Sequence, residues 1–163
     1  MSKSDTNTKG RLANKIALVT GAAGNLGSEI CRAFAREGAF VIMTGRTAER
    51  IEAARDQLIE DTGAPAERVS TAVLDGADPD SVRAAVAKLK TEFGRIDILI
   101  NNAGSAGPKQ PLYNVPLSRE EMTEQGEAED VRDAMVNILG VTWNLARIVS
   151  PIMPVGGSMV NIS

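Results

Sequence analysis

Five short runs of apolar, largely β-branched residues recur along the chain, and stretches with helical periodicity separate them. The runs lie at 15–20, 39–44, 68–75, 96–101 and 157–163. Near-continuous apolar runs of this length are typical of parallel strands that are covered on both faces. Strands that alternate with helices predict a doubly wound α/β sheet with right-handed crossovers.

The intervening stretches carry the spacing of amphipathic helices. Apolar residues recur every four positions at 26–34, and those at 82–93 follow the spacing of one helix face. Asp78 followed by Pro79 is typical of an N-cap with proline at the first helical position. We therefore expect a Rossmann-type three-layer sandwich that is truncated after its fifth strand, where the sequence ends.

Composition excludes several kinds of function. The 163 residues, 43% of them hydrophobic, are enough for one domain with a substantial core. There is no histidine and a single cysteine, Cys31, which excludes disulfide frameworks, Cys/His zinc sites and catalysis by imidazole. We expect no metal site. A net charge of −3 gives no general attraction to nucleic acid or to an anionic membrane, so neither is an expected partner.

The N-terminal segment differs from the rest of the chain. Residues 1–14 are mostly polar and cannot bury enough apolar surface to offset the entropy of ordering them, so we expect a flexible arm there. They lack the apolar core of a secretion signal, and no later apolar run approaches the roughly 18 residues needed to span a bilayer. We therefore expect a soluble, cytoplasmic protein with one domain at 15–163.

The stretch TGAAGNLG, residues 20–27, joins the first predicted strand to the first predicted helix. Gly21, Gly24 and Gly27 permit a tight turn, and the free N–H groups of the helix start can bind a pyrophosphate. Asn25 stands where another glycine is expected, but asparagine tolerates positive φ and can cap a helix. No Lys-Ser/Thr pair follows, which indicates a dinucleotide rather than a triphosphate with Mg²⁺. A glycine-rich turn without a ligand is the alternative.

The second predicted strand ends in Thr44, Gly45 and Arg46, with no acidic residue. An acid at this place would accept hydrogen bonds from the adenine-ribose hydroxyls of NAD and would repel a 2′-phosphate. A guanidinium would bind the 2′-phosphate, so the pattern favours NADPH as the cofactor. The alternative is that Arg46 is a solvated residue near a helix start.

Polar residues also follow the third and fourth predicted strands. Asp75 and Gly76 come after the third, and Asn101 and Asn102 end the fourth. A ligand in a sheet of this kind lies along the carboxyl ends of the strands. Paired asparagines there can lock neighbouring loops and offer polar groups to that ligand.

Together these motifs resemble the short-chain dehydrogenase/reductase family, over about residues 12–163. The family's glycine-rich signature, its adenine-contacting acid and its NNAG motif all have counterparts in this sequence. The cofactor-binding positions expected from the motifs and the resemblance are Thr20, Gly21, Gly24, Asn25, Leu26, Gly27, Arg46, Asp75, Gly76, Asn101, Asn102, Ala103 and Gly104. The resemblance implies NADPH-dependent reduction of a carbonyl group in a small molecule, an aldehyde or an acyl-CoA-derived compound.

The resemblance also implies catalytic positions. Asn137 would hold a water in a proton relay, and Ser163 would hydrogen-bond the developing oxyanion. The family's proton donor is the tyrosine of a Tyr-x-x-x-Lys pair, whose lysine lowers the tyrosine pKa. The one tyrosine here, Tyr113, precedes the serine and has Leu117 at the fourth place, so it does not match. We therefore expect a C-terminally incomplete reductase that has no turnover by itself.

Two other classes of function stay open. One is a non-catalytic module that binds a dinucleotide or serves assembly, which the missing Tyr-x-x-x-Lys pair favours. The other is a methyltransferase on a related sheet, which the lack of an acid after the second strand disfavours. In the family, the helix that here bears Asn137 and Trp143 often packs against its symmetry mate, so the resemblance implies a homo-oligomer.

Overall fold

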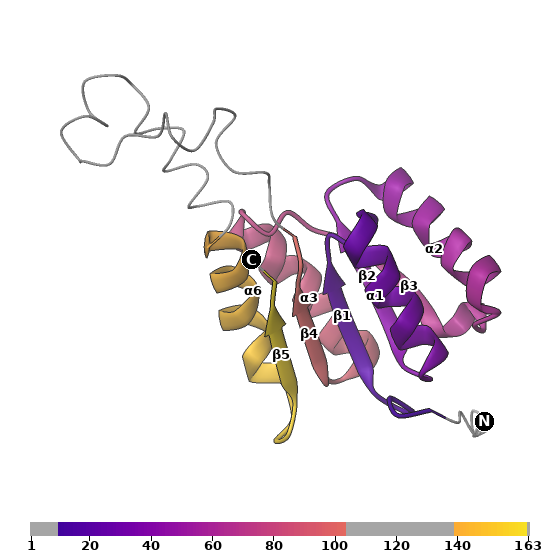
Figure 1. The fold of residues 1–163 in the computed structure, drawn as a ribbon. Helices are drawn as coiled ribbons and strands as arrows, with labels where there is room; N and C mark the ends of the chain where they lie inside the picture. The colour runs from indigo at the N-terminus through magenta and orange to yellow at the C-terminus, as the bar shows by residue number, and fades with distance from the viewer. Residues whose placement is uncertain (1–9, 104–138, 163) are drawn as a thin grey trace, which may run out of the picture.

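A computed structural model describes residues 10–103 and 139–162 (Figure 1). The strands are β1 (Ile16–Thr20), β2 (Phe40–Gly45), β3 (Val69–Val73), β4 (Ile98–Asn101) and β5 (Ser158–Asn161). The helices are α1 (Asn25–Arg36), α2 (Ala48–Thr62), α3 (Pro79–Phe93) and α6 (Val141–Val149), with short 3-10 helices η1 (Ala66–Arg68) and η4 (Ser150–Ile152). Within these two ranges, no helix combines the length and apolar character of a membrane span.

The five strands form one parallel sheet in the order β3-β2-β1-β4-β5. The central strand β1 pairs with β2, where Ile16 lies opposite Phe40, and with β4, where Ala17 lies opposite Ile98. The chain therefore builds the sheet outward from β1 to β3, then crosses to the other side of β1 for β4 and β5. The predicted doubly wound α/β fold is confirmed.

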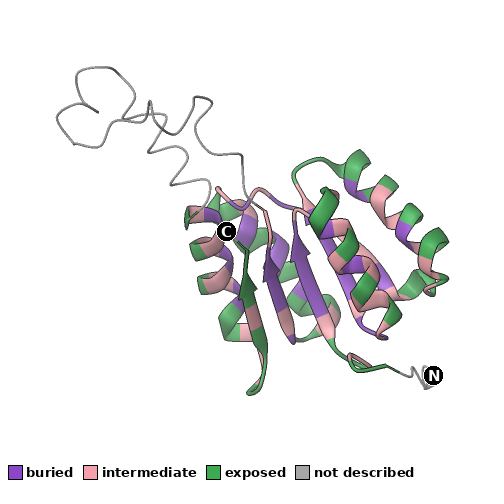
Figure 2. Ribbon diagram, in the orientation of Figure 1, coloured by how far each residue is buried: buried purple, intermediate pink, exposed green. Residues whose placement is uncertain are grey.

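Two hydrophobic cores lie on opposite faces of the sheet. Successive side chains of a strand point to opposite faces, so Leu18 joins a core built with α3 and α6, while Ala17 and Val19 join a core built with α1 and α2. The central residues of β1, β2 and β4 are buried without a break, and only residues at the strand ends are half-buried (Figure 2). Burial on both faces explains why these runs are apolar throughout.

The two edge strands are less covered than the three strands between them. In β3 only Val69 is buried, and β5 is the strand whose outer side the sequence left without a covering helix. Of its residues only Met159 is half-buried, and Val160 is 45% exposed (Figure 2). Among the described residues, β5 pairs with β4 alone, at the edge of the sheet. An edge strand presents its free side to solvent, so the exposure of β5 is what a strand at the edge of the sheet is expected to show.

Local signals at helix ends are partly confirmed. The Asp78 side chain caps α3 by accepting a hydrogen bond from the Asp80 N–H at 2.9 Å, and Pro79 is the first helical residue, as predicted. The apolar stripe of α3 is buried through Val82 and Leu89. The same periodicity failed at Leu26, which is 53% exposed because it lies at the loop end of α1 and not over the sheet.

Residues before β1 contact the body of the domain. The Leu12 N–H donates to the Glu37 carbonyl at 2.9 Å, and the Arg11 guanidinium pairs with the Glu37 carboxylate at 3.0 Å. This pairing holds the pKa of Glu37 below its usual range. The domain boundary at residues 14 and 15 stays a prediction, since 1–9 lie outside the described residues.

Candidate functional site

The carboxyl ends of β1, β2, β3 and β4 border two adjoining pockets. The first, which we call the Asp75 pocket, has a volume of about 180 Å³ and is bordered by the loop after β3. The second, the glycine-loop pocket, has a volume of about 350 Å³ and lies between the N-terminal ends of α1 and α2. Gly21, Thr44, Gly45, Arg46 and Ala103 line both. The edge of the sheet that the sequence indicated is therefore hollowed along several strands.

Most of the residues predicted to bind the cofactor line one of these pockets. They are Thr20, Gly21, Gly24, Asn25, Leu26, Gly27, Arg46, Asp75, Gly76, Asn102 and Ala103. Asn101 does not: its buried side chain donates through Nδ2 to Oδ1 of Asn161 on β5, at 2.8 Å, so it ties two strands together. Gly104, Asn137 and Ser163 lie outside the described residues, and the functional roles of the whole set stay predictions.

Gly21 and Gly27 explain why the first loop is rich in glycine. Gly21 has a φ of 62°, which residues with a side chain rarely adopt. A Cβ on Gly27 would lie 2.2 Å from the carbonyl oxygen of Gly21, so no side chain fits there. The strand and the helix therefore approach as closely as the backbone allows.

Asn25 does not cap α1, although the sequence allowed it to. Asn25 is the first residue of α1, and the N-cap is Gly24, with φ −83° and ψ 167° and no side-chain hydrogen bond. Because the turn places its positive φ at Gly21, Asn25 needs neither an unusual φ nor a capping role. The start of α1 thus keeps free backbone N–H groups beside the glycine-loop pocket, an arrangement suited to an anion.

Thr20 and Asn102 join the glycine loop to the end of β4. The buried Thr20 hydroxyl accepts hydrogen bonds from the N–H groups of Asn102 at 3.0 Å and Ala103 at 2.9 Å, and it donates to the Ile100 carbonyl at 3.3 Å. In return, Nδ2 of Asn102 donates to the carbonyls of Thr20 at 3.0 Å and Gly21 at 3.3 Å. The prediction that the paired asparagines lock neighbouring loops therefore holds for Asn102 and not for Asn101.

The Asp75 loop is held by contacts that the sequence did not reveal. Oδ1 of Asp75 accepts from the Ala77 N–H at 3.0 Å, and Nδ2 of Asn144 on α6 donates to the Gly76 carbonyl at 3.0 Å. Val141, also on α6, lines the Asp75 pocket and leaves no room for a Cβ on Gly76. The residues near Asp75 in the sequence give no indication that α6, more than 60 residues later, lines this pocket.

The helix α6 presents two different faces. Leu145 is fully buried in the core, while Trp143 is 66% exposed. Residues two apart on a helix point in nearly opposite directions, so the two side chains do not form one stripe. A homo-oligomer through the exposed face of this helix stays a prediction.

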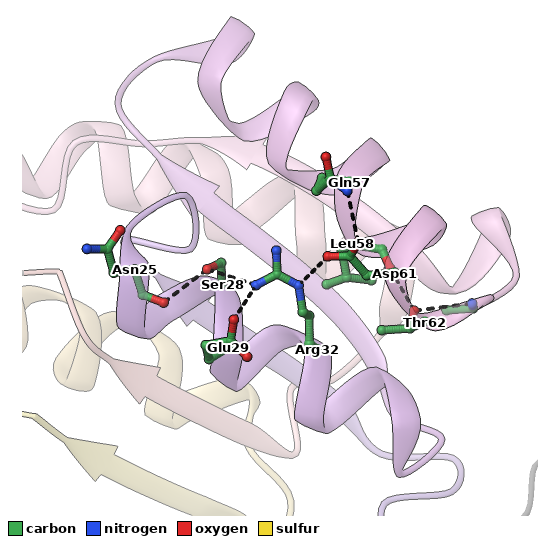
Figure 3. Close-up of polar contacts among 9 residues, drawn as sticks. Asn25, Ser28, Glu29, Arg32, Gln57, Leu58, Asp61 and Thr62 are labelled. Atoms are coloured by element: carbon green, nitrogen blue, oxygen red, sulfur yellow. Dashed lines mark hydrogen bonds and ion pairs between the residues drawn. The ribbon is translucent and has the colours of Figure 1, made fainter.

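An ion-pair cluster ties α1 to α2, with Arg32 at its centre (Figure 3). Nε of Arg32 donates to Oδ2 of Asp61 at 2.7 Å, and Nη1 donates to Oε1 of Glu29 at 2.7 Å. Gln57 on α2 donates to the other Asp61 oxygen at 2.9 Å. Both helices carry pocket-lining residues at their N-terminal ends, so this cluster fixes one helix relative to the other behind the pocket.

The same arginine connects the cluster to the glycine loop. Nη1 of Arg32 donates to Oγ of Ser28 at 3.2 Å, and the Ser28 hydroxyl donates to the Asn25 carbonyl at 3.0 Å (Figure 3). Asn25 is the first residue of α1 and lines the glycine-loop pocket. A short chain of hydrogen bonds therefore runs from α2 to the loop.

Asp61→Asn should remove a part of the stability that depends on pH. Hydrogen bonds from Gln57 and then Arg32 lower the pKa of Asp61, so its carboxylate stabilises the fold above the unfolded-state pKa of about 3.9. That contribution is lost as the pH falls through the lower pKa of the folded state. We expect urea midpoints of the variant below those of the native protein at neutral pH, with the gap closing in acid. A gap that stays constant in acid would contradict this assignment.

Comparison with known proteins shows the same architecture in reductases. A family profile described as short chain dehydrogenase matches residues 15–163. The 3-oxoacyl-(acyl-carrier-protein) reductase FabG of Thermotoga maritima is 33% identical over 156 residues, which are 94% of this chain and 56% of that protein. The chain thus spans about half the length of this curated relative.

Solved structures extend the comparison. The N-domain of a bacterial malonyl-CoA reductase with NADP is 55% identical and superimposes with a TM-score of 0.82, covering 94% of this chain and 29% of that one. A blue fluorescent protein from a metagenomic library, in complex with NADPH, is 29% identical with a TM-score of 0.72, covering 93% of this chain and 56% of that one. With the profile match over nearly the whole sequence, these similarities establish that the chain belongs to the short-chain dehydrogenase family.

Proposed function

We propose that this chain is the NADPH-binding part of a reductase that converts malonic semialdehyde to 3-hydroxypropionate within a malonyl-CoA reductase. The observation that carries the cofactor assignment is Arg46, which lies at the end of β2 and lines both pockets. The 55% identity to the N-domain of malonyl-CoA reductase supports the substrate assignment. Family membership argues against a methyltransferase.

The two pockets fit the parts of a dinucleotide phosphate. The free N–H groups at the start of α1 suit the pyrophosphate, and the lack of a Cβ on Gly27 lets it approach the backbone. Leu74, Val141 and Ala77 give the Asp75 pocket an apolar lining that suits the adenine base. The nicotinamide of the bound cofactor would supply the hydride to the aldehyde carbon.

Asn137 and Ser163 complete the proposal on the catalytic side. Ser163 would donate a hydrogen bond to the carbonyl oxygen as negative charge develops on it, and Asn137 would hold a water that relays protons. Both assignments rest on the family resemblance.

Arg46→Ala should narrow the preference for NADPH over NADH. A guanidinium contact to a phosphate is a charge-assisted hydrogen bond worth about 1.5–3 kcal/mol, so we expect NADPH affinity to fall about tenfold or more while NADH affinity is unchanged. Isothermal titration calorimetry of the native and variant proteins with both cofactors measures this. If the native protein binds the two cofactors equally, the assignment of NADPH is wrong.

A non-catalytic dinucleotide-binding or assembly module is the second candidate function. The observation that favours it is Tyr113, the one tyrosine, which has no lysine at the fourth place after it. Both candidates predict no turnover of malonic semialdehyde by the 163-residue protein alone, and they differ in whether the chain joined to a segment that carries the Tyr-x-x-x-Lys pair turns it over. Oxidation of NADPH by homogeneous 163-residue protein would contradict the non-catalytic function and require a proton donor other than the family's tyrosine.

A further inference from the structure

Arg50, which the sequence motifs did not single out, lines the glycine-loop pocket together with Arg46. It is the third residue of α2, and the next residue, Ile51, is buried against the end of β2. A Cβ on Gly45 would lie 2.9 Å from Cγ2 of Ile51, so the first turn of α2 sits directly on the strand end that leads into Arg46. An arginine from the end of β2 and one from the first turn of α2 thus both line the pocket.

Other arginines near Arg50 are engaged within the protein. Nε of Arg55, on the same helix, donates to the Val69 carbonyl at 2.8 Å, and Arg32 is held by Asp61 and Glu29. Within residues 10–103 and 139–162, neither the Arg46 nor the Arg50 side chain forms a hydrogen bond or an ion pair. The guanidinium N–H groups of Arg46 and Arg50 therefore have no hydrogen-bond acceptor among the described residues.

Among the described residues that line the glycine-loop pocket, none carries a carboxylate. Glu49 precedes Arg50 in the first turn of α2, but it does not line the pocket. Arg46 and Arg50 are therefore the charged residues of the described lining, and they give it a positive charge. A phosphate monoester carries about −1.5 to −2 charges near neutral pH and offers three acceptor oxygens, which one guanidinium neutralises only in part.

We propose that Arg50 is a second specificity-determining residue, which contacts the 2′-phosphate of NADPH from α2 while Arg46 contacts it from the end of β2. The inference rests on the proposed binding of NADPH. It assigns the phosphate on the ribose, and not the pyrophosphate, because Arg50 adjoins Arg46 whereas the pyrophosphate lies at the start of α1. NADH lacks the 2′-phosphate, so its binding does not depend on Arg50.

The test compares Arg50→Ala and Arg50→Lys with Arg83→Ala as a matched control, all in the full chain. Arg83 is an exposed arginine near the start of α3 that lines neither pocket, and its pair with Asp80 lies at the surface. Calorimetry gives dissociation constants for NADPH, NADH and the fragment 2′,5′-ADP. Circular dichroism and urea unfolding show whether each variant keeps the native fold.

We expect Arg50→Ala to weaken NADPH and 2′,5′-ADP about tenfold and to leave NADH within about twofold of the native value. Arg50→Lys keeps a point charge without the guanidinium fork, so it should lose about threefold. Arg83→Ala should bind all three as the native protein does. Unchanged NADPH affinity in Arg50→Ala overturns the inference, and an equal loss for NADPH and NADH would move Arg50 to the pyrophosphate.

Failure of the proposed function has a different outcome. In that case the native protein itself would bind NADPH no better than NADH, before any variant is compared. If the native protein prefers NADPH but Arg50→Ala binds NADPH as tightly as the Arg83→Ala control does, only the inference about Arg50 fails.

Discussion

Replacing Gly27 with alanine should reduce NADPH affinity by about five- to a hundredfold. The added Cβ would lie 2.2 Å from the carbonyl oxygen of Gly21 and 2.8 Å from Nδ2 of Asn102. Neither atom moves easily, because Gly21 holds a positive φ and Asn102 is bonded to Thr20 and Gly21. Overpacking of this kind costs about 1–3 kcal/mol, and relieving it moves the start of α1 away from the loop.

Two other glycines provide controls for this prediction. A Cβ on Gly24, in the same loop, would lie 3.3 Å from the Gly21 carbonyl oxygen, so Gly24→Ala should show a smaller loss. Gly63, at the end of α2, has a φ of 65° with open space around it, so Gly63→Ala adds strain far from the pockets. Calorimetry with NADPH, alongside urea unfolding, separates lost binding from lost stability. Native affinity in Gly27→Ala would show that the loop does not hold the cofactor.

Thr20→Val should destabilise the domain by about 2–4 kcal/mol. Valine matches threonine in shape but cannot accept the hydrogen bonds from the N–H groups of Asn102 and Ala103. Each buried donor left without an acceptor costs about 1–3 kcal/mol. Thr20 is 1% exposed, so water does not replace the lost acceptor. Urea unfolding at equilibrium measures the difference.

Thr20→Ser is the matched control, because serine keeps the hydroxyl and loses only a methyl group. We expect it to lose about 1 kcal/mol. Hydrogen exchange gives an independent measurement, since the Ala103 amide should lose protection in Thr20→Val and keep it in Thr20→Ser. Equal stability of the two variants would mean that the hydroxyl does not hold the loops together.

The sequence predicted the strands closely because their signal is local. The apolar runs at 15–20 and 39–44 became β1 and β2 with ends shifted by a single residue. A strand buried on both faces must be apolar along its whole length, and a short stretch of sequence records that requirement. The run that became β5 has the same pattern without the same burial, because burial depends on what lies beside a strand.

Some features of the candidate site were also predicted from the sequence, and others were not. Glycine spacing indicated the loop, and the ends of the strands indicated Arg46 and Asp75 as residues of one edge. The sequence did not indicate that Asn101 turns toward β5 while its neighbour Asn102 turns toward the loop. Asn101 ends β4 and Asn102 follows it, and their partners depend on the position of β4 between β1 and β5 in the sheet.

The sequence by itself determined the alternation of strands and helices, the glycine loop and the cation that replaces an acid after β2. Each of these features follows from residues close together in the sequence, through their backbone preferences and their periodicity. The tertiary structure alone decided that Gly24 caps α1, that Asn144 supports the Asp75 loop and that Arg50 joins Arg46 at the glycine-loop pocket. The contacts of Asn144 and Arg50 depend on which surfaces meet when the sheet assembles. The cap at Gly24 depends on which residue of the turn has a positive φ, and the local sequence does not determine that.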